Sequence, residues 1–167
     1  MRLILGVDPG ATGAIAGLDP DDPDTLHYAE DMPMAGGQIA VPLLRVLVDR
    51  IGPENVAAVV VEAVHSMPKQ GVASSFKFGQ NYGTLLGYFG ALFPVVHVPP
   101  TVWKTVLHLN GKDKDVARAR AIERWPHQAH LLARKKDIGR ADAALIALWH
   151  AETLRTPTPT PQREAAL

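Results

Sequence analysis

Two hydrophobic runs that end in a carboxylate are the first features of this sequence to suggest chemistry. Asp8 ends the run LILGVD and is followed by the turn residues PGATG, while Glu62 ends the run VAAVVVE. A carboxylate at the mouth of a buried strand loses hydration, so a partner must compensate for that loss. A backbone cap, a basic side chain, the metal-phosphate group of a nucleotide, or a metal ion shared with other carboxylates would each do so.

A third inward-facing acid is expected in the segment KKDIGRADAALIALW. Asp142 begins an apolar helix, one turn before the side chains that would face the sheet, and Asp137 precedes it as a candidate fourth acid. Taken singly, such acids have structural explanations, such as a favourable position in the first helical turn or the capping of a local turn. Three or four inward acids together repel one another unless a cation joins them. Hard oxygen ligands favour Mg²⁺ or Mn²⁺.

The hydrophobic pattern predicts an α/β fold that would hold these acids. Residues 56–62 lack alternation, as expected for a central strand covered on both faces. A three-strand meander followed by two parallel strands, with helices on both faces, makes a five-stranded mixed sheet. Asp8 and Glu62 each end a strand, so the two carboxylates converge if those strands are neighbours. Sheets of this kind place their chemistry at strand ends. We expect strands over 3–8, 14–18, 25–30, 56–62 and 95–98, and helices over 38–50, 72–93, 102–107, 115–124 and 140–154.

The formal net charge is zero, but the charges are unevenly distributed. Residues 101–141 hold ten of the seventeen Lys and Arg residues and four acids. Such a basic segment is either a solvated helix face or a phosphate-binding surface. Within it, Lys114 stands at the entrance of a predicted helix, where backbone N–H groups also favour a phosphate.

Composition and length predict one domain over residues 1–155, followed by a disordered Thr/Pro tail over 156–167. There is no cysteine, which excludes disulfides and thiolate zinc sites and suits a reducing cytoplasm. No run of 18 apolar residues and no charged-then-apolar leader is present, so we expect neither a membrane span nor a signal peptide.

Five segments in order, GVDPGATG, VVVEAV, FKFGQNYGTLLGYFGAL, PPTVWKTVLHLNGKDKDVAR and GRADAALIALWHA, resemble the RuvC-type Holliday-junction resolvases of the ribonuclease H-like superfamily. The resemblance covers about residues 2–153. It implies a ribonuclease H-like fold and a metal-dependent crossover junction endodeoxyribonuclease. Such an enzyme hydrolyses paired phosphodiesters of four-way junction DNA as a homodimer.

The resemblance also assigns residues. Asp8, Glu62 and Asp142 match the family's metal-binding acids, which would hold two Mg²⁺ or Mn²⁺ ions. The family's fourth acid falls on Gly139, so Asp137 is the nearest substitute. Lys114 matches a lysine near the scissile phosphate, and Lys104 matches a second basic position. The further candidates for DNA contacts are Lys112, Arg118, Arg134, Lys135, Lys136 and Arg140, with Lys69 and either His65 or Met67 in the loop that would probe the junction centre.

Glycines in FGQNYGTLLGYFG recur at spacings that line one face of a helix. Each interior glycine costs roughly 1 kcal/mol relative to alanine, so a close approach of another backbone is expected to compensate. That backbone belongs either to the chain's own sheet or to a two-fold mate, and two-fold symmetry suits two opposed nicks. The expected dimer interface contains Gly79, Gly83, Gly87, Tyr82 and Phe89.

Three other functions share parts of this pattern. GVDPGATG also resembles the phosphate-binding turn of actin-like ATPases and sugar kinases, but their second domain and second phosphate loop are not found in this sequence. A related ribonuclease H-like nuclease would act on other branched DNA or RNA substrates. A non-catalytic DNA-binding module would not need the three acids.

Overall fold

A computed structural model of the chain describes residues 1–64 and 71–156. Its centre is a five-stranded sheet in the order β3-β2-β1-β6-β7. β1 is antiparallel to β2 and β2 to β3, whereas β1 is parallel to β6 and β6 to β7. The expected meander followed by two parallel strands is therefore confirmed. The strands are β1 (Leu3–Asp8), β2 (Ala14–Asp19), β3 (Asp22–Asp31), β6 (Val56–Glu62) and β7 (Val95–Val98).

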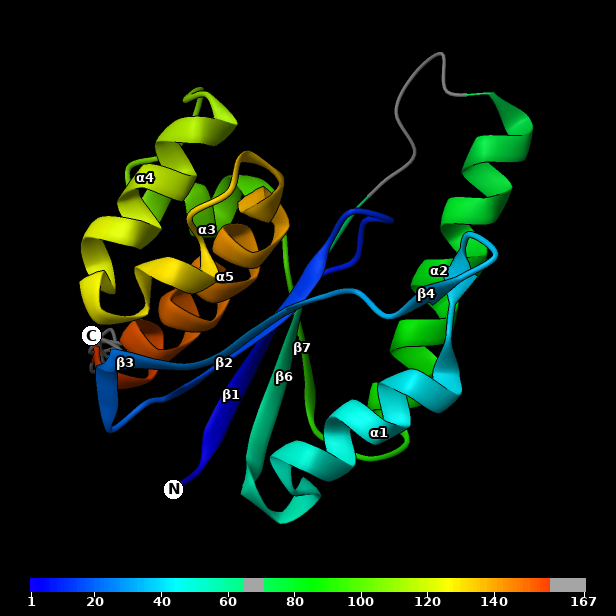
Figure 1. The fold of residues 1–167 in the computed structure, drawn as a ribbon, viewed down its shortest axis with the longest axis horizontal. Coiled ribbons are helices and arrows are strands. Elements are labelled where there is room, and N and C mark those ends of the chain that lie inside the picture. Colours follow the sequence, from blue (N-terminus) through cyan, green and yellow to red (C-terminus); the bar gives the residue numbers. More distant parts are fainter. Residues whose placement is uncertain (65–70, 157–167) are drawn as a thin grey trace, which may run out of the picture.

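Helices cover both faces of this sheet (Figure 1). The helices α3, α4 and α5 pack on one face around one hydrophobic core, and α1 and α2 pack on the other face around a second core. β1 supplies Ile4 to the first core and Leu3, Leu5 and Val7 to the second, which explains why its sequence shows no alternation. The helices are α1 (Val41–Ile51), α2 (Val72–Gly90), α3 (Pro100–Val106), α4 (Lys114–Arg124) and α5 (Ile138–Arg155), with short 3₁₀ helices η1 (Pro53–Asn55), η2 (Pro126–Leu131) and η3 (Lys135–Asp137).

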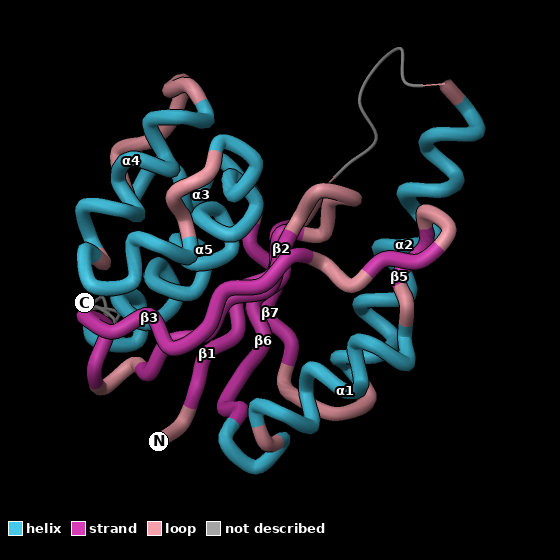
Figure 2. Tube along the Cα trace, in the orientation of Figure 1, coloured by secondary structure: helices cyan, strands magenta, loops and turns pink. Residues whose placement is uncertain are grey.

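A small hairpin beside α2 was not expected from the sequence. Its two-residue strands, β4 (Met34–Ala35) and β5 (Gln38–Ile39), lie away from the main sheet (Figure 2). Asn81 of α2 fastens it, because the Asn81 Oδ1 accepts a hydrogen bond from the Ile39 N–H at 3.0 Å and its Nδ2 donates to the Gly37 carbonyl at 3.2 Å. β5 occupies residues 38–39, which the sequence predicts as the start of the first helix, and that helix instead begins at Val41.

The backbones of β1 and α5 touch, and this contact determines the position of the C-terminal acid. A Cβ atom on Gly6 of β1 would overlap the carbonyl oxygen of Ala143 and crowd the backbone N of Ala147. A Cβ atom on Gly139 would likewise overlap the Thr12 carbonyl in the turn after β1. Glycine at both positions lets the start of α5 lie directly against the end of β1.

The main sheet and its two helical layers are built from residues 3–155. Of the predicted tail, Thr156 is described and residues 157–167 lie outside the described part of the chain. Within the described residues, no helix is long and apolar enough to cross a membrane.

Candidate active site

Asp8 lies where β1 ends and the tight turn begins. Its Oδ1 accepts a hydrogen bond from the Gly10 N–H at 3.2 Å, so part of its charge is capped by its own turn. Burial raises the pKa of Asp8, while the Gly10 hydrogen bond and the charges of Lys114 and Lys104 act in the opposite direction. The carboxylate is thus held in a place that disfavours its charge, with two lysines within electrostatic reach.

Glu62 ends β6 at the same edge of the sheet. The parallel register pairs Val7 with Val61. Asp8 and Glu62 are the next residues on their strands, so they lie side by side at the ends of adjacent strands. The Glu62 Oε1 accepts a hydrogen bond from the Trp103 Nε1–H at 2.9 Å. Burial raises the pKa of Glu62; the Trp103 hydrogen bond lowers it and the charge of Asp8 raises it further. The convergence expected of these two strand ends is present in the structure.

Asp142 reaches the same place from the first turns of α5. Its Oδ1 is buried and receives no hydrogen bond from the described part of the chain. Burial and the charges of Asp8 and Glu62 raise the pKa of Asp142 to about 7, against the opposing effect of Lys104 and Lys114. Three carboxylates from β1, β6 and α5 therefore repel one another at one edge of the sheet.

This arrangement provides the donors that a divalent cation requires. Carboxylate oxygens are ligands that suit Mg²⁺ and Mn²⁺. The buried Oδ1 of Asp142 receives no hydrogen bond from the described chain and is therefore available to a cation. With the side chains as they lie in residues 1–64 and 71–156, no group of three or more His, Cys, Asp or Glu is close enough to hold a metal ion. The three acids influence one another electrostatically, and the chemistry of their oxygen atoms suits a divalent cation.

Asp137 does not join this group as a free acid. Its carboxylate is fully buried and ion-paired with Arg134 at 2.7 Å, and Arg134 also donates its backbone N–H at 2.8 Å. Although burial raises the pKa of Asp137, the hydrogen bonds from Arg134 lower it below its ordinary value. The expected substitute for the fourth acid is thus occupied by an arginine, and a side chain at Gly139 would meet the Thr12 carbonyl.

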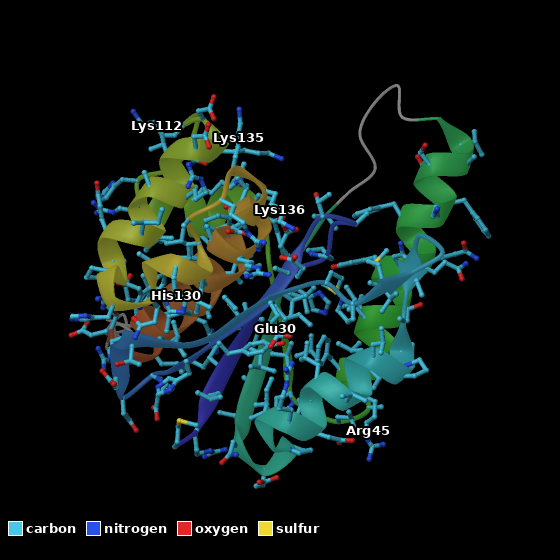
Figure 3. The ribbon with its side chains drawn as sticks, in the orientation of Figure 1. Glu30, Arg45, Lys112, His130, Lys135 and Lys136 are labelled. Atoms are coloured by element: carbon cyan, nitrogen blue, oxygen red, sulfur yellow. The ribbon has the colours of Figure 1, made fainter. Side chains whose placement is uncertain are left out.

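Five of the expected lysines lie at the same end of the molecule as the acids. Lys114 is the first residue of α4 and is exposed, and the α4 N-terminus is capped by the Asp113 side chain, which accepts from the Asp115 N–H at 2.9 Å. Lys104 is half-buried, with its Nζ 5.0 Å from the centre of the Trp103 ring. Figure 3 shows Lys112 at this end, where Lys135 and Lys136 also lie.

Three arginines expected to contact DNA have partners within the chain. Arg118 donates to the carbonyls of Leu132 and Ala133, and Arg140 forms an ion pair with Asp31 at 2.6 Å. Arg134 is likewise paired with Asp137, although its own side chain is exposed. Contacts of these three arginines with DNA stay a prediction, and each contact would have to form beside, or in place of, an existing one.

The glycines of α2 are exposed. A Cβ atom on Gly79, Gly83 or Gly87 would have no neighbouring atom within 4 Å outside the helix's own backbone, so the described chain does not cover this face. Tyr82 is half-buried beside it. Phe89, expected at the interface, is instead fully buried in the core under α1 and α2, because it follows Asn81 and Leu85 along the opposite face.

Trp103 is the site residue that the sequence did not single out. The segment VWKT drew attention to Lys104, but the indole of Trp103 is the group that contacts Glu62. This hydrogen bond joins residues 41 positions apart, and no local pattern indicates it. The other candidates in the loop, His65, Met67 and Lys69, lie outside the described residues.

No family model matches the sequence. One curated protein, the chloroplastic Holliday junction resolvase MOC1 of Chlamydomonas reinhardtii, is 40% identical over 93 residues. The match covers 53% of this chain and 10% of that protein, so the chain spans about one tenth of the length of its curated relative. The sequence similarity to a Holliday junction resolvase is confirmed.

Solved structures of resolvases share the fold. Thermus thermophilus RuvC matches with a TM-score of 0.59 and 20% identity, covering 92% of this chain and 96% of RuvC. The structure of T. thermophilus RuvC in complex with a Holliday junction substrate matches with a TM-score of 0.58 and 22% identity, covering 93% of this chain and 96% of that chain. The Fowlpox virus resolvase in complex with Holliday junction DNA matches with a TM-score of 0.50 and 18% identity, covering 93% of this chain and 100% of that chain. The chain thus has the ribonuclease H-like fold of RuvC, as expected.

Proposed function

We propose that this chain is a metal-dependent endonuclease that resolves four-way DNA junctions by paired phosphodiester hydrolysis. One observation carries the proposal: three carboxylates converge from β1, β6 and α5, and one buried oxygen of Asp142 lacks a partner in the described chain. The charges of Lys104 in α3 and Lys114 in α4 act on the same acids. The RuvC fold and the similarity to a Holliday junction resolvase supply the substrate class.

Asp8, Glu62 and Asp142 would hold two Mg²⁺ ions, or Mn²⁺ in their place. Bound at such a site, a pair of divalent ions supplies a nucleophile from water and stabilises the charge on the leaving oxygen. The central strand-end position of Asp8 suits an acid shared by both ions, with Glu62 and Asp142 on either side. Asp137 would serve as a fourth ligand only by exchanging Arg134 for a cation.

The lysines of this edge would receive the DNA backbone. Lys114 is exposed at the first position of α4, and its charge acts on Asp8, Glu62 and Asp142, so it would contact a phosphate near the acids. Lys104 would contact the same phosphate from α3, closer to Glu62. Lys112, Lys135 and Lys136 are exposed at the same end and would make contacts that position the DNA without reading its sequence.

A homodimer would provide two such sites. In the described chain there is open space beside the α2 glycines, and Val72 and Phe76 on the same helix are 86% and 66% exposed. Gly83 also lines a hollow of about 470 Å³, together with Ile39 of the hairpin and Val41 of α1. Exposed apolar side chains next to an open helix face favour an isologous interface. Because a four-way junction is nearly two-fold symmetric, this interface would relate the two active sites correctly for opposed nicks.

A cleavage assay with synthetic DNA tests the proposal. The chain is incubated with a labelled four-way junction, or with a linear duplex of the same arms, with and without Mg²⁺. We expect paired nicks in the junction only, and only with the metal ion. The Asp8→Asn variant should bind the junction but not cut it, because the amide keeps the shape of the acid and removes its charge. Metal-dependent cleavage by this variant at the parental rate would refute the site. Preferential cleavage of another branched DNA or RNA would show that the chain is a related nuclease of the same fold with a different substrate.

The place where this chain acts is a separate proposal. The curated relative is named as chloroplastic, which describes that protein. The complete lack of cysteine favours a reducing compartment for this chain. We propose the cytoplasm, and fractionation of the source cells with an antibody to the chain would test it.

A further inference from the structure

Trp103 connects the acidic and the basic sides of the site. Its side chain is fully buried at the start of α3, yet the indole Nε1–H donates to the Glu62 carboxylate at 2.9 Å. Within the described residues this is the one hydrogen bond that the Glu62 carboxylate receives from the chain. The face of the same indole lies 5.0 Å from the Lys104 Nζ, within the range of a cation–π contact.

Local sequence fixes where this indole lies. Val98 at the end of β7 pairs with Glu62, and the Ala63 N–H donates to the Val98 carbonyl at 2.7 Å. Pro99 and Pro100 then start α3 immediately, because proline suits the first helical positions. Trp103 follows one turn later, on the face of α3 that packs on the core. The indole is therefore held by the fold and does not depend on Glu62 for its place.

An indole N–H is well suited to orient a metal-binding carboxylate. It donates one hydrogen bond and accepts none, so it fixes one oxygen of Glu62 and leaves the other oxygen available. It carries no charge, so it does not compete for the carboxylate as a lysine or arginine would. Hydrogen bonds from outside the ligand set typically alter metal affinity or activity by 10–100-fold when removed.

We propose that Trp103 is a positioning residue that orients Glu62 as a ligand for a divalent cation. This inference rests on the proposed function, because it takes Glu62 to be a metal ligand. The ring face also keeps Lys104 beside the same carboxylate, so one side chain sets the relative positions of an acid and a cation of the site. In this role Trp103 would act through Glu62 and would not itself be a metal ligand.

Trp103→Phe is the variant that isolates the N–H group. Phenylalanine retains an aromatic ring in the core and a face for Lys104, but it has no donor for Glu62. The chain offers a matched control in Trp125→Phe: Trp125 is also fully buried, its Nε1–H donates to the Pro23 carbonyl at 3.0 Å, and Arg124 lies 5.9 Å from its ring centre. Pro23 lies at the opposite end of the sheet from Asp8, because Asp8 pairs with Ala14 whereas Asp19 pairs with Asp22.

The measurement is Mn²⁺ affinity of the DNA-free chain by titration calorimetry, with thermal unfolding as a check on folding. We expect Trp103→Phe to weaken Mn²⁺ binding about 10-fold. Trp125→Phe should lower the melting temperature without changing the affinity. In a Glu62→Gln background, adding Trp103→Phe should have no further effect, because the two residues act as one unit.

The possible results separate this inference from the proposed function. Unchanged Mn²⁺ affinity in Trp103→Phe, together with weakened binding in Glu62→Gln, would overturn the positioning role and leave the metal site intact. Equal losses of affinity in Trp103→Phe and Trp125→Phe would also overturn it, since both would then reflect a loosened core. A parent chain that binds no Mn²⁺, or a Glu62→Gln variant with parental affinity, would overturn the metal site itself.

Discussion

The Asp142→Asn variant should fold more stably than the parent chain at neutral pH. Asp142 is buried beside Asp8 and Glu62, and one of its oxygens has no hydrogen-bond partner in the described residues. Its charge is therefore unfavourable in the folded chain before any cation binds. Asparagine has nearly the same shape and removes that charge.

The magnitude follows from the pKa. Burial and the charges of Asp8 and Glu62 raise the pKa of Asp142 from 3.8 to about 7. At about 1.4 kcal/mol per tenfold change in proton affinity, ionising this group in the folded chain costs at most about 4 kcal/mol. Burying the new amide N–H₂ with incomplete partners takes back ~1–3 kcal/mol. We expect a net gain of ~2 kcal/mol, which corresponds to a rise in melting temperature of about 4–8 °C for a domain of this size.

The raised pKa of Asp142 also determines how the stability of the parent chain changes with pH. Because the folded-state pKa of Asp142 lies above the unfolded value, the folded chain holds the proton more tightly than the unfolded chain. The free energy of unfolding of the parent should therefore fall as the pH rises from about 4 to 7 and level off above that range. The advantage of Asp142→Asn should be largest at pH 8 and small at pH 5, where the parent's Asp142 is already protonated.

Denaturant unfolding of both chains in EDTA at pH 5 and pH 8 measures the effect. Adding Mn²⁺ at pH 8 should stabilise the parent more than the variant, because a ligand that binds the folded state stabilises it. A variant that is less stable than the parent at pH 8 would refute the electrostatic reasoning. So would a difference in stability that is the same at both pH values.

Three further predictions concern residues around the acids. Lys114→Ala should lower the single-turnover cleavage rate strongly and the junction affinity modestly, because a positive charge is most valuable where negative charge develops; a collapse of affinity with an unchanged rate would make Lys114 an anchoring residue. Asp137→Asn should reduce cleavage much less than Asp8→Asn does, since Arg134 occupies its carboxylate; equal losses in a cleavage assay would make Asp137 a fourth metal ligand. Gly83→Leu should yield a folded monomer by sedimentation and lose paired cleavage, because space beside Gly83 is open in the single chain; a parent that sediments as a monomer at micromolar concentration, with or without junction, would contradict the dimer.

Hydrophobic patterning was enough to predict the sheet and the meeting of two acids. The unbroken apolar runs before Asp8 and Glu62 require strands covered on both faces, and the register of β1 with β6 brings their ends together. Asp142 was predictable because its distance from the apolar face of α5 follows helical periodicity. These features depend on local sequence and on general rules for sheets.

Contacts between segments far apart in the chain could not be predicted from the sequence. The carbonyls that bind Arg118 become available only where the chain turns back through η2, and no composition rule indicates that they face α4. The hydrogen bond from Trp103 to Glu62 crosses from α3 to β6. The error on Phe89 has a simpler cause: it follows Leu85 by four residues on the buried face of α2, whereas the exposed glycines lie on the opposite face.

If the chain is the nuclease proposed above, Lys114 would affect catalysis in two separable ways. Its charge lowers the pKa of Asp142, so its loss would raise that pKa above about 7 and leave more of the acid protonated at neutral pH. Its charge would also receive the phosphate, and that contribution does not depend on the ionisation of Asp142. Raising the pH at limiting Mg²⁺ should therefore restore part of the Lys114→Ala cleavage rate if the first effect is large. A rate deficit that stays constant from pH 6.5 to pH 9 would assign the whole effect of Lys114 to the phosphate.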